Sequence, residues 1–446
     1  METAIKIIQF LLSISILVLI HELGHFTFAK LFKTRVEKFY LFFNPWFSLF
    51  KIKKGDTEYG LGWLPLGGFV KISGMIDESL DREQLKKPAQ DWEFRSKSVS
   101  QRFFIMFGGV LYNIVFAWFI YSFMLAYWGE NLLPNQSLKD GIWCVHPKAT
   151  ELGFRNGDKL VSVNGKSHEM FIDLSQEMLY GGQVQVRRGS KDTTIQIDYS
   201  DISDLIESQS GMLFYPRVPM IVGVISDTSI NAKSGLLVKD KIIAVNNNEL
   251  GYYDEFAQTI APYKGDSISV TVLRENTEVD LRLAVSEKGF VEIIPAIFEM
   301  EDLERFGIYE FKKVEYSILQ SIPAGIIRAK ETLMGYIKQF KLLFQIDGAY
   351  KSLGGFISMG SIFPSEWDWQ VFWELTALLS VILGFMNFLP IPALDGGHIL
   401  FLVYEIIRGK KPSDTFLERA QIIGMTLLFA LLLLANGNDL LRLFSN

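Results

Sequence analysis

The sequence has 446 residues, of which 49% are hydrophobic and only 21% are charged, and its formal net charge is −6. Soluble domains carry about 25% charged residues, so the apolar excess indicates a membrane protein. The small net charge, with no basic stripe, argues against a nucleic-acid partner. A single cysteine, Cys144, excludes an intrachain disulfide.

Four apolar runs are long enough to cross about 30 Å of hydrocarbon as helices. They lie near residues 4–27, 103–128, 371–393 and 418–436. The first run has no basic cluster before it and no small-residue cleavage site after it, which favours a membrane span over a signal peptide. The sequence therefore predicts a polytopic α-helical membrane protein with about four transmembrane helices.

An HExxH motif, His21-Glu22-x-x-His25, closes the first span. Residues four apart share one helical face, so both imidazoles can reach one zinc ion. Glu22 is adjacent and can act as general base. Ionisable side chains at membrane depth are costly and by default functional. The alternative is a pair of histidines that cap carbonyl groups at a helix end.

A Gly-rich segment with strand-like alternation follows in the first loop, over residues 56–73. We predict a β-hairpin there. In the second span, Gly108 and Gly109 would let helices pack closely. Asn113, one turn further on, has either a packing role or a direct role at the site. These elements, with the first two spans, form a first membrane half over residues 1–128.

An internal repeat with a period of about 82 residues follows the second span. The string Gly153–Gly165 aligns with Gly235–Asn247, and a helix-like stretch and two strands follow each copy. The strings resemble the PDZ family, which implies PDZ-like α+β domains over residues 129–212 and 213–300 that bind peptide at a sheet edge. Lys239 replaces a family glycine in the second copy. Structural spacers that bind nothing are the alternative.

Residues 301–370 connect the repeat to the second membrane half, which covers residues 371–446. Apolar residues recur at helical spacing between about 316 and 346. This amphipathic helix is expected either on the outer membrane surface or against the catalytic spans. A passive connector is equally plausible.

Two prolines and two glycines interrupt the chain between Asn387 and His398, and they do not suit a regular helix. Irregular backbone at membrane depth needs protein or a polar cavity around it, which marks a functional feature. Two histidines and an open water position require a third protein ligand. Asp395 is favoured for this role, and His398 is the competing choice.

Lys and Arg residues are concentrated in the 28–102 and 394–417 loops. The positive-inside rule assigns these loops to the cytoplasm. Both termini and the 129–370 segment are then external, and the metal motif lies near the cytoplasmic face.

HExxH at the end of the first span, with N-x-x-P-x-P-x-L-D-G late in the chain, resembles the site-two protease family of intramembrane zinc metalloproteases. Span order, length and the external repeat are similar to its bacterial RseP-like branch. The resemblance implies one zinc ion per chain, held by His21, His25 and Asp395. It implies Glu22 as the base and Asn387 beside the reacting peptide, and it places His398 outside the metal ligands.

The resemblance also implies a bacterial inner membrane location and regulated proteolysis. The expected substrates are single-span proteins already trimmed outside, of the anti-sigma-factor type, and remnant signal peptides. The hairpin would dip into the membrane and hold unwound substrate as an added strand beside Gly60, Gly62, Gly67 and Gly68. Gly109 stands where the family usually has proline. The rival interpretation is a membrane-anchored PDZ scaffold with a vestigial metal site.

Overall fold

A computed structural model describes residues 2–75, 88–198, 201–202, 213–296, 298, 300–345, 350 and 353–445. The chain divides into two compact units. The first contains Met1–Glu130, Glu315–Phe344 and Gly348–Asn446, and the second contains Asn131–Val314 and Gln345–Asp347. The predicted boundary at residue 212 lies outside the described residues.

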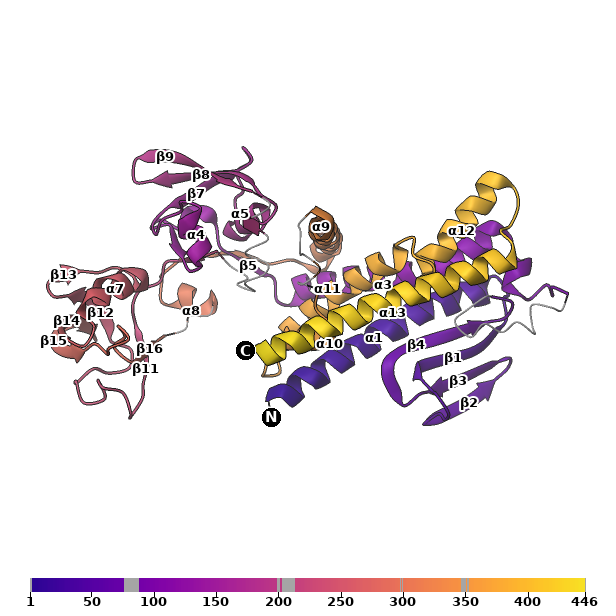
Figure 1. The fold of residues 1–446 in the computed structure, drawn as a ribbon, viewed down its shortest axis with the longest axis horizontal. Coiled ribbons are helices and arrows are strands. Elements are labelled where there is room, and N and C mark those ends of the chain that lie inside the picture. The colour runs from indigo at the N-terminus through magenta and orange to yellow at the C-terminus, as the bar shows by residue number, and fades with distance from the viewer. Residues whose placement is uncertain are drawn as a thin grey trace. The chain divides into compact units, whose positions relative to one another are not determined.

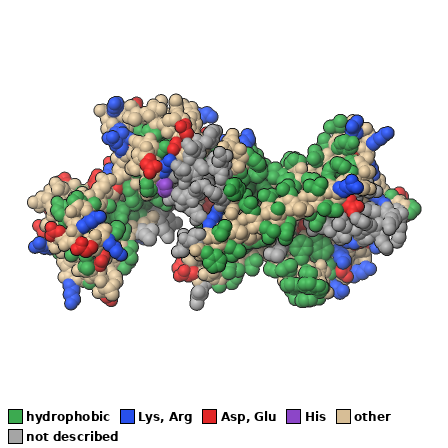
Figure 2. Space-filling model, in the orientation of Figure 1, with side chains coloured by type: hydrophobic (Ala, Val, Ile, Leu, Met, Phe, Trp, Pro, Cys, Tyr) green, Lys and Arg blue, Asp and Glu red, His purple; other side chains and the backbone are tan. Residues whose placement is uncertain are grey.

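Within the described residues, four helices of the first unit are long and apolar enough to cross a membrane, as predicted (Figure 1). They are α1 (Glu2–Leu31), α3 (Val99–Tyr127), α11 (Trp369–Phe388) and α13 (Asp414–Ser445). A helix suits this setting because it pairs its backbone polar groups internally. Hydrophobic side chains cover much of the visible surface of these helices (Figure 2).

Small residues and buried hydroxyl groups join the long helices. A Cβ atom on Gly24 of α1 would lie 2.2 Å from the Gly108 carbonyl oxygen of α3, so the two backbones nearly touch. Ser380 of α11 donates a hydrogen bond to the Asn113 carbonyl oxygen at 2.8 Å. Interhelical contacts of this kind hold spans together where lipid supplies no hydrophobic drive. Helices α1, α3 and α11 thus form the frame of the unit.

A four-stranded sheet in the order β2-β3-β1-β4 lies between α1 and α3 in sequence. Its strands are β1 (Val36–Phe43), β2 (Phe50–Lys54), β3 (Thr57–Leu61) and β4 (Leu64–Ile72). β1 pairs in parallel with β3 and antiparallel with β4. The predicted hairpin over residues 56–73 is therefore wrong, because β1 separates its two strands.

The connection between β3 and β4 crosses the end of β1 at Gly62. The Gly62 N–H donates to the Leu41 carbonyl oxygen at 2.8 Å. A Cβ atom on Gly62 would lie 2.2 Å from the Phe43 carbonyl oxygen, so a side chain would block the crossing. Glycine permits this close approach of two backbones, whereas a two-residue link would otherwise indicate a hairpin.

The third span breaks as predicted, but its continuation differs. After Leu389–Leu394, the chain enters α12 (Asp395–Arg408), so the predicted connection over 394–417 contains a helix that was not predicted. Gly396 and Gly397 lie in the first turn of α12, although they were expected to disfavour a helix. A Cβ atom on Gly396 would lie 2.2 Å from the Leu389 carbonyl oxygen. The glycines thus let the broken segment fold back onto the helix start.

The predicted amphipathic helix is α9 (Ile318–Gln345), and it packs against α3. The Trp118 indole N–H donates to the Ile322 carbonyl oxygen at 3.0 Å. Of the alternatives, contact with the spans is the one seen.

The short helix α10 (Phe356–Ser361) is anchored by Asp439 of α13, which accepts hydrogen bonds from the backbone N–H groups of Gly355 and Ser358. Residues 346–349 and 351–352 of this connector lie outside the described residues.

The second unit contains the two copies of the repeat. The first has α4 (Pro147–Glu151), α5 (Phe171–Met178) and the sheet β7 (Lys159–Val163), β8 (Gly182–Arg188) and β9 (Lys191–Ile197). The second has α7 (Tyr253–Ile260) and the sheet β13 (Asn248–Glu249), β12 (Lys241–Val245), β14 (Ser267–Arg274) and β15 (Thr277–Ala284). The remaining short pieces are β5 (Glu130–Leu132), β6 (Ile142–Cys144), β10 (Phe214–Pro216), β11 (Val222–Ile225), β16 (Ile293–Pro295), α8 (Met300–Arg305) and β17 (Lys312–Val314).

The two copies share contacts as well as element order. Arg188 pairs with the buried Asp158 at 2.7 Å, and Arg274 pairs with the buried Asp240 at 2.6 Å. Each guanidinium also donates to the carbonyl oxygen of the glycine that opens its copy. Lys239 has a φ of 76°, in the region where the first copy has glycine. The repeat found in the sequence therefore corresponds to a repeated local structure.

Candidate metal centre

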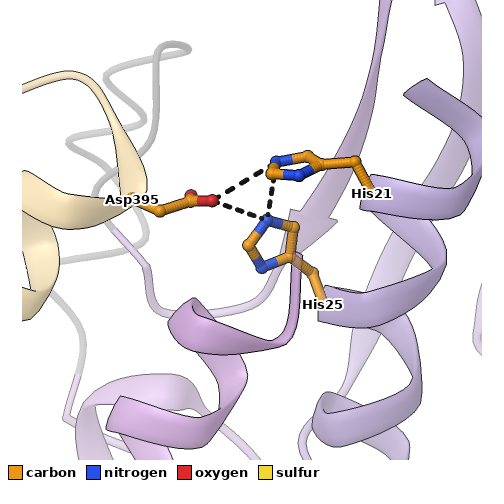
Figure 3. Close-up of side chains that lie close together, drawn as sticks. All are labelled: His21, His25 and Asp395. Carbon is orange, nitrogen blue, oxygen red and sulfur yellow. Dashed lines mark hydrogen bonds and ion pairs between the residues drawn. The ribbon is translucent and has the colours of Figure 1, made fainter. Parts of the chain in front are cut away.

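Three side chains from two helices point toward one another (Figure 3). His21 and His25 extend from α1, and Asp395 extends from the first turn of α12. The two Nε2 atoms are 3.3 Å apart, and each lies 3.3 Å from Oδ2 of Asp395. A tetrahedral zinc site with bonds of about 2.0–2.1 Å has ligand-to-ligand edges of about 3.4 Å. The observed triangle matches three corners of such a site.

The chemistry of the three side chains also suits a divalent cation. Both histidines are buried, and Oδ2 of Asp395 is buried without a hydrogen-bond partner among the described residues. A buried carboxylate oxygen without a hydrogen bond is costly, and a cation bound between it and the two Nε2 atoms would satisfy it. Among the described residues, only these three form a group of His, Cys, Asp and Glu ligands close enough to hold a metal. Zinc accepts this combination of two imidazoles and one carboxylate.

A cleft of about 620 Å³ opens beside the three residues, and Glu22 lines it. Glu22 lies against β4, because a Cβ atom on Gly68 would lie 3.5 Å from its Cγ, and Val70 of the same strand also lines the cleft. β4 is the last strand of the sheet, with β1 on its other side. The outer edge of β4 therefore faces the cleft and Glu22. An open strand edge can pair with a further extended chain.

The glycines of the Gly-rich segment divide into two groups. Gly67 and Gly68 line the cleft. A Cβ atom on Gly68 would lie 2.8 Å from the Val18 side chain, so glycine keeps β4 close to α1. Gly60 packs on the Tyr40 ring and Gly62 on the end of β1, and neither lines the cleft. Of the four glycines predicted to dock the substrate, Gly67 and Gly68 are the two that line the cleft.

The two other predicted residues lie at the cleft without joining the metal group. Nδ2 of Asn387, in the last turn of α11, is 3.4 Å from Nε2 of His21. His398 lines the cleft, but Asp395 rather than His398 completes the cluster.

Gln421 of α13 also lines the cleft and is buried, and sequence reasoning missed it. The sequence offered little signal for it, because Gln421 follows Glu418 and Arg419 in the polar first turns of α13. A second contact links the same helix to the site: a Cβ atom on Gly424 would lie 1.6 Å from the Pro392 carbonyl oxygen. The last helix therefore closes one side of the broken segment.

Four apolar helices, with a histidine and carboxylate cluster built on HExxH, define a multi-pass membrane protein of the metalloprotease class. The sequence of residues 9–431 matches the family described as Peptidase family M50, and the chain belongs to that family.

Curated relatives agree over nearly the whole length. The chain is 29% identical to the regulator of sigma E protease of Haemophilus influenzae, and 98% of each chain is covered. It is 28% identical to the regulator of sigma-E protease RseP of Escherichia coli, again with 98% of each covered. A relative from Vibrio cholerae, 26% identical with the same coverage, has the words zinc metalloprotease in its name. The resemblance seen in the sequence is confirmed.

Proposed function

We propose that this protein is an intramembrane zinc protease that hydrolyses peptide bonds within transmembrane segments. The observation that carries the proposal is the 3.3 Å triangle of His21, His25 and Asp395 beside a cleft that Glu22 lines. All three ligands belong to the unit that contains the long apolar helices. The chemistry would therefore take place at membrane depth.

The side chains around the cluster would have separate roles in peptide hydrolysis. Bound zinc would lower the pKa of water and polarise the substrate carbonyl. Glu22 would take a proton from the attacking water and return it to the leaving amine. Asn387, 3.4 Å from His21, would offer its amide N–H to the carbonyl oxygen as negative charge develops there. The cleft wall would limit the access of other water.

The outer edge of β4 would hold the substrate in an extended form. A transmembrane helix hides its peptide groups in its own hydrogen bonds, so it must unwind before one of them can react. A strand edge replaces those lost hydrogen bonds with new ones. Gly68 lets β4 lie close to α1, so this edge runs beside Glu22, and Gly67, Gly68 and Val70 all line the cleft.

Charge and apolar exposure support a membrane orientation. The basic loops at 28–102 and 394–417 favour a cytoplasmic side for the sheet and for α12, with both termini and the repeat domains outside. Trp46 is 92% exposed at the tip between β1 and β2, and Phe47 and Leu49 beside it are largely exposed. Aromatic side chains favour the membrane interface, so this tip would dip into the bilayer.

The substrate class follows from the family and from the repeat. Relatives that carry the name regulator of sigma E protease suggest single-span substrates of the anti-sigma-factor type in a bacterial inner membrane. The two repeat copies, read as PDZ-like domains, would restrict access to chains already trimmed outside. They would do this by gripping a new carboxyl end or by excluding large external domains.

The test compares the purified protein with its Glu22→Gln variant on a model single-span substrate, with products identified by mass spectrometry. We expect the wild type to cut within the apolar segment and the variant to lose at least about a hundredfold in rate, because general base catalysis is worth that much. Zinc content should be equal in both proteins. Equal cleavage by both would contradict the mechanism, and binding of peptide without any cleavage would favour a scaffold.

A further inference from the structure

One face of α3 supports both histidines of the metal cluster. Ile105, Gly109 and Asn113 are spaced four residues apart and so lie along one side of the helix. The Ile105 carbonyl oxygen accepts a hydrogen bond from Nδ1 of His25 at 2.8 Å. The Asn113 side-chain amide lies 3.1 Å from Nδ1 of His21. Gly109, between them, leaves room for both rings.

The hydrogen bond to Ile105 fixes the state of His25. A carbonyl oxygen only accepts, so Nδ1 of His25 must carry the proton. In a neutral imidazole the other nitrogen then keeps its lone pair, and that nitrogen is the Nε2 atom directed at Asp395. His25 is thereby held in the form that binds a metal.

Asn113 can do the same for His21 through its amide oxygen. The side chain is fully buried, and its Oδ1 has no hydrogen-bond partner among the described residues. Rotation of the amide exchanges the positions of Oδ1 and Nδ2. The oxygen would then accept a hydrogen bond from Nδ1–H of His21, which leaves Nε2 of that ring free to bind a metal. With the nitrogen in that position, Nε2 would have to carry the proton and could not bind.

We propose that Asn113 is a positioning residue that accepts a hydrogen bond from Nδ1 of His21 and so orients this ligand toward the metal. The inference rests on the proposed zinc site. His25 receives the equivalent support from backbone, which no substitution can remove, so Asn113 is the side chain through which the pair can be tested. Residues that hydrogen-bond a metal ligand, without touching the metal themselves, typically contribute about 10- to 100-fold to metal affinity.

The experiment measures zinc affinity of the full chain in detergent by competition with a chromophoric chelator. Asn113→Leu keeps the volume and removes the acceptor, and we expect about 10- to 100-fold weaker zinc binding. Asn113→Asp keeps an acceptor and should restore affinity to within about threefold of the wild type. Thr376→Val removes a buried hydrogen bond between α11 and Ser13 of α1, away from the cluster, and should leave affinity unchanged.

The outcomes separate this inference from the proposed function. Wild-type affinity in Asn113→Leu would overturn the inference, as would equal losses in the Leu and Asp variants, which would indicate packing alone. If Asn113→Leu does not fold, Asn113→Ala provides the same comparison with a smaller side chain. A wild-type protein that binds zinc tightly yet cuts no substrate would contradict the proposed function and leave the role of Asn113 standing.

Discussion

A methyl group on Gly109 would lie 2.5 Å from Nε2 of His25. No carbon atom can occupy that position without moving the ring, since interiors are close-packed. We therefore expect Gly109→Ala to weaken zinc binding by at least about tenfold while the helices remain folded. Chelator competition measures this change. Gly437→Ala is the matched control, because nothing lies within 4 Å of a Cβ atom at that helical glycine. Equal affinities in the two variants would contradict the packing described.

The edge strand β4 gives a second prediction, at Val70, which lines the cleft together with Glu22. Val70→Pro removes the N–H group but suits an edge strand, and it should lower proteolytic activity at least about tenfold without changing zinc content. Val70→Ala keeps the N–H group and should retain activity. Cleavage rates and metal analysis on the same preparations separate the two effects. Full activity in the proline variant would rule out a role for this edge.

The paired arginines of the repeat predict matching losses of stability. Arg274→Ala would leave the buried Asp240 carboxylate without its partner, and Arg188→Ala would do the same to Asp158. Because each arginine is partly exposed, we expect each substitution to lower the free energy of unfolding of the affected copy by less than the loss of a fully buried ion pair would. Proteolysis of the full chain under native conditions reports this opening. A loss in only one variant would show that the copies are not equivalent.

The ion pair between Arg274 and Asp240 also predicts that stability depends on pH. Burial acts to raise the pKa of Asp240, but the hydrogen bonds from Arg274 and the Leu237 backbone outweigh it, so the pKa lies below its ordinary value. A lowered carboxyl pKa adds stability above the unfolded value of about 3.9, and that stability is lost as pH falls through the folded value. The difference between wild type and Arg274→Ala should therefore narrow below about pH 4. A difference that stays constant down to pH 2 would contradict this origin.

Cys144 should react slowly with alkylating reagents. Burial, helped by Asp158 and Asp254, raises the pKa of its thiol to about 12. Compared with a free thiol of pKa about 8.5, the thiolate at neutral pH is about a thousandfold less abundant. The rate of iodoacetamide labelling measures this fraction. A cysteine placed at the exposed Ser190 in a Cys144→Ala background should label far faster, and equal rates would contradict the prediction.

Local patterns in the sequence were enough to predict the membrane spans and to propose the metal ligands. Long apolar runs predict spans because the bilayer sets their length, and HExxH predicts two ligands because a helix brings i and i+4 together. Asp395 could be proposed as a ligand for a similar reason, since prolines and glycines at membrane depth mark irregular backbone around a site. The sequence already favoured Asp395 over His398, and the structure brings Asp395 together with both histidines.

Relationships between distant segments could not be predicted in the same way. The crossing at Gly62 looks like a hairpin link in sequence, and only the position of β1 shows otherwise. The contact between Asn113 and His21 joins residues of two separate spans, and no spacing rule connects them. α12 was not predicted, because the glycines in its first turn have low helix propensity. In the folded protein, the same glycines allow this turn to pack on the chain that precedes it.

The zinc content of the purified chain tests the central claim most directly. Metal analysis should find one zinc ion per chain in the wild type and in His398→Ala, and almost none in Asp395→Ala. Full zinc in Asp395→Ala, with loss in His398→Ala, would contradict the site formed by His21, His25 and Asp395.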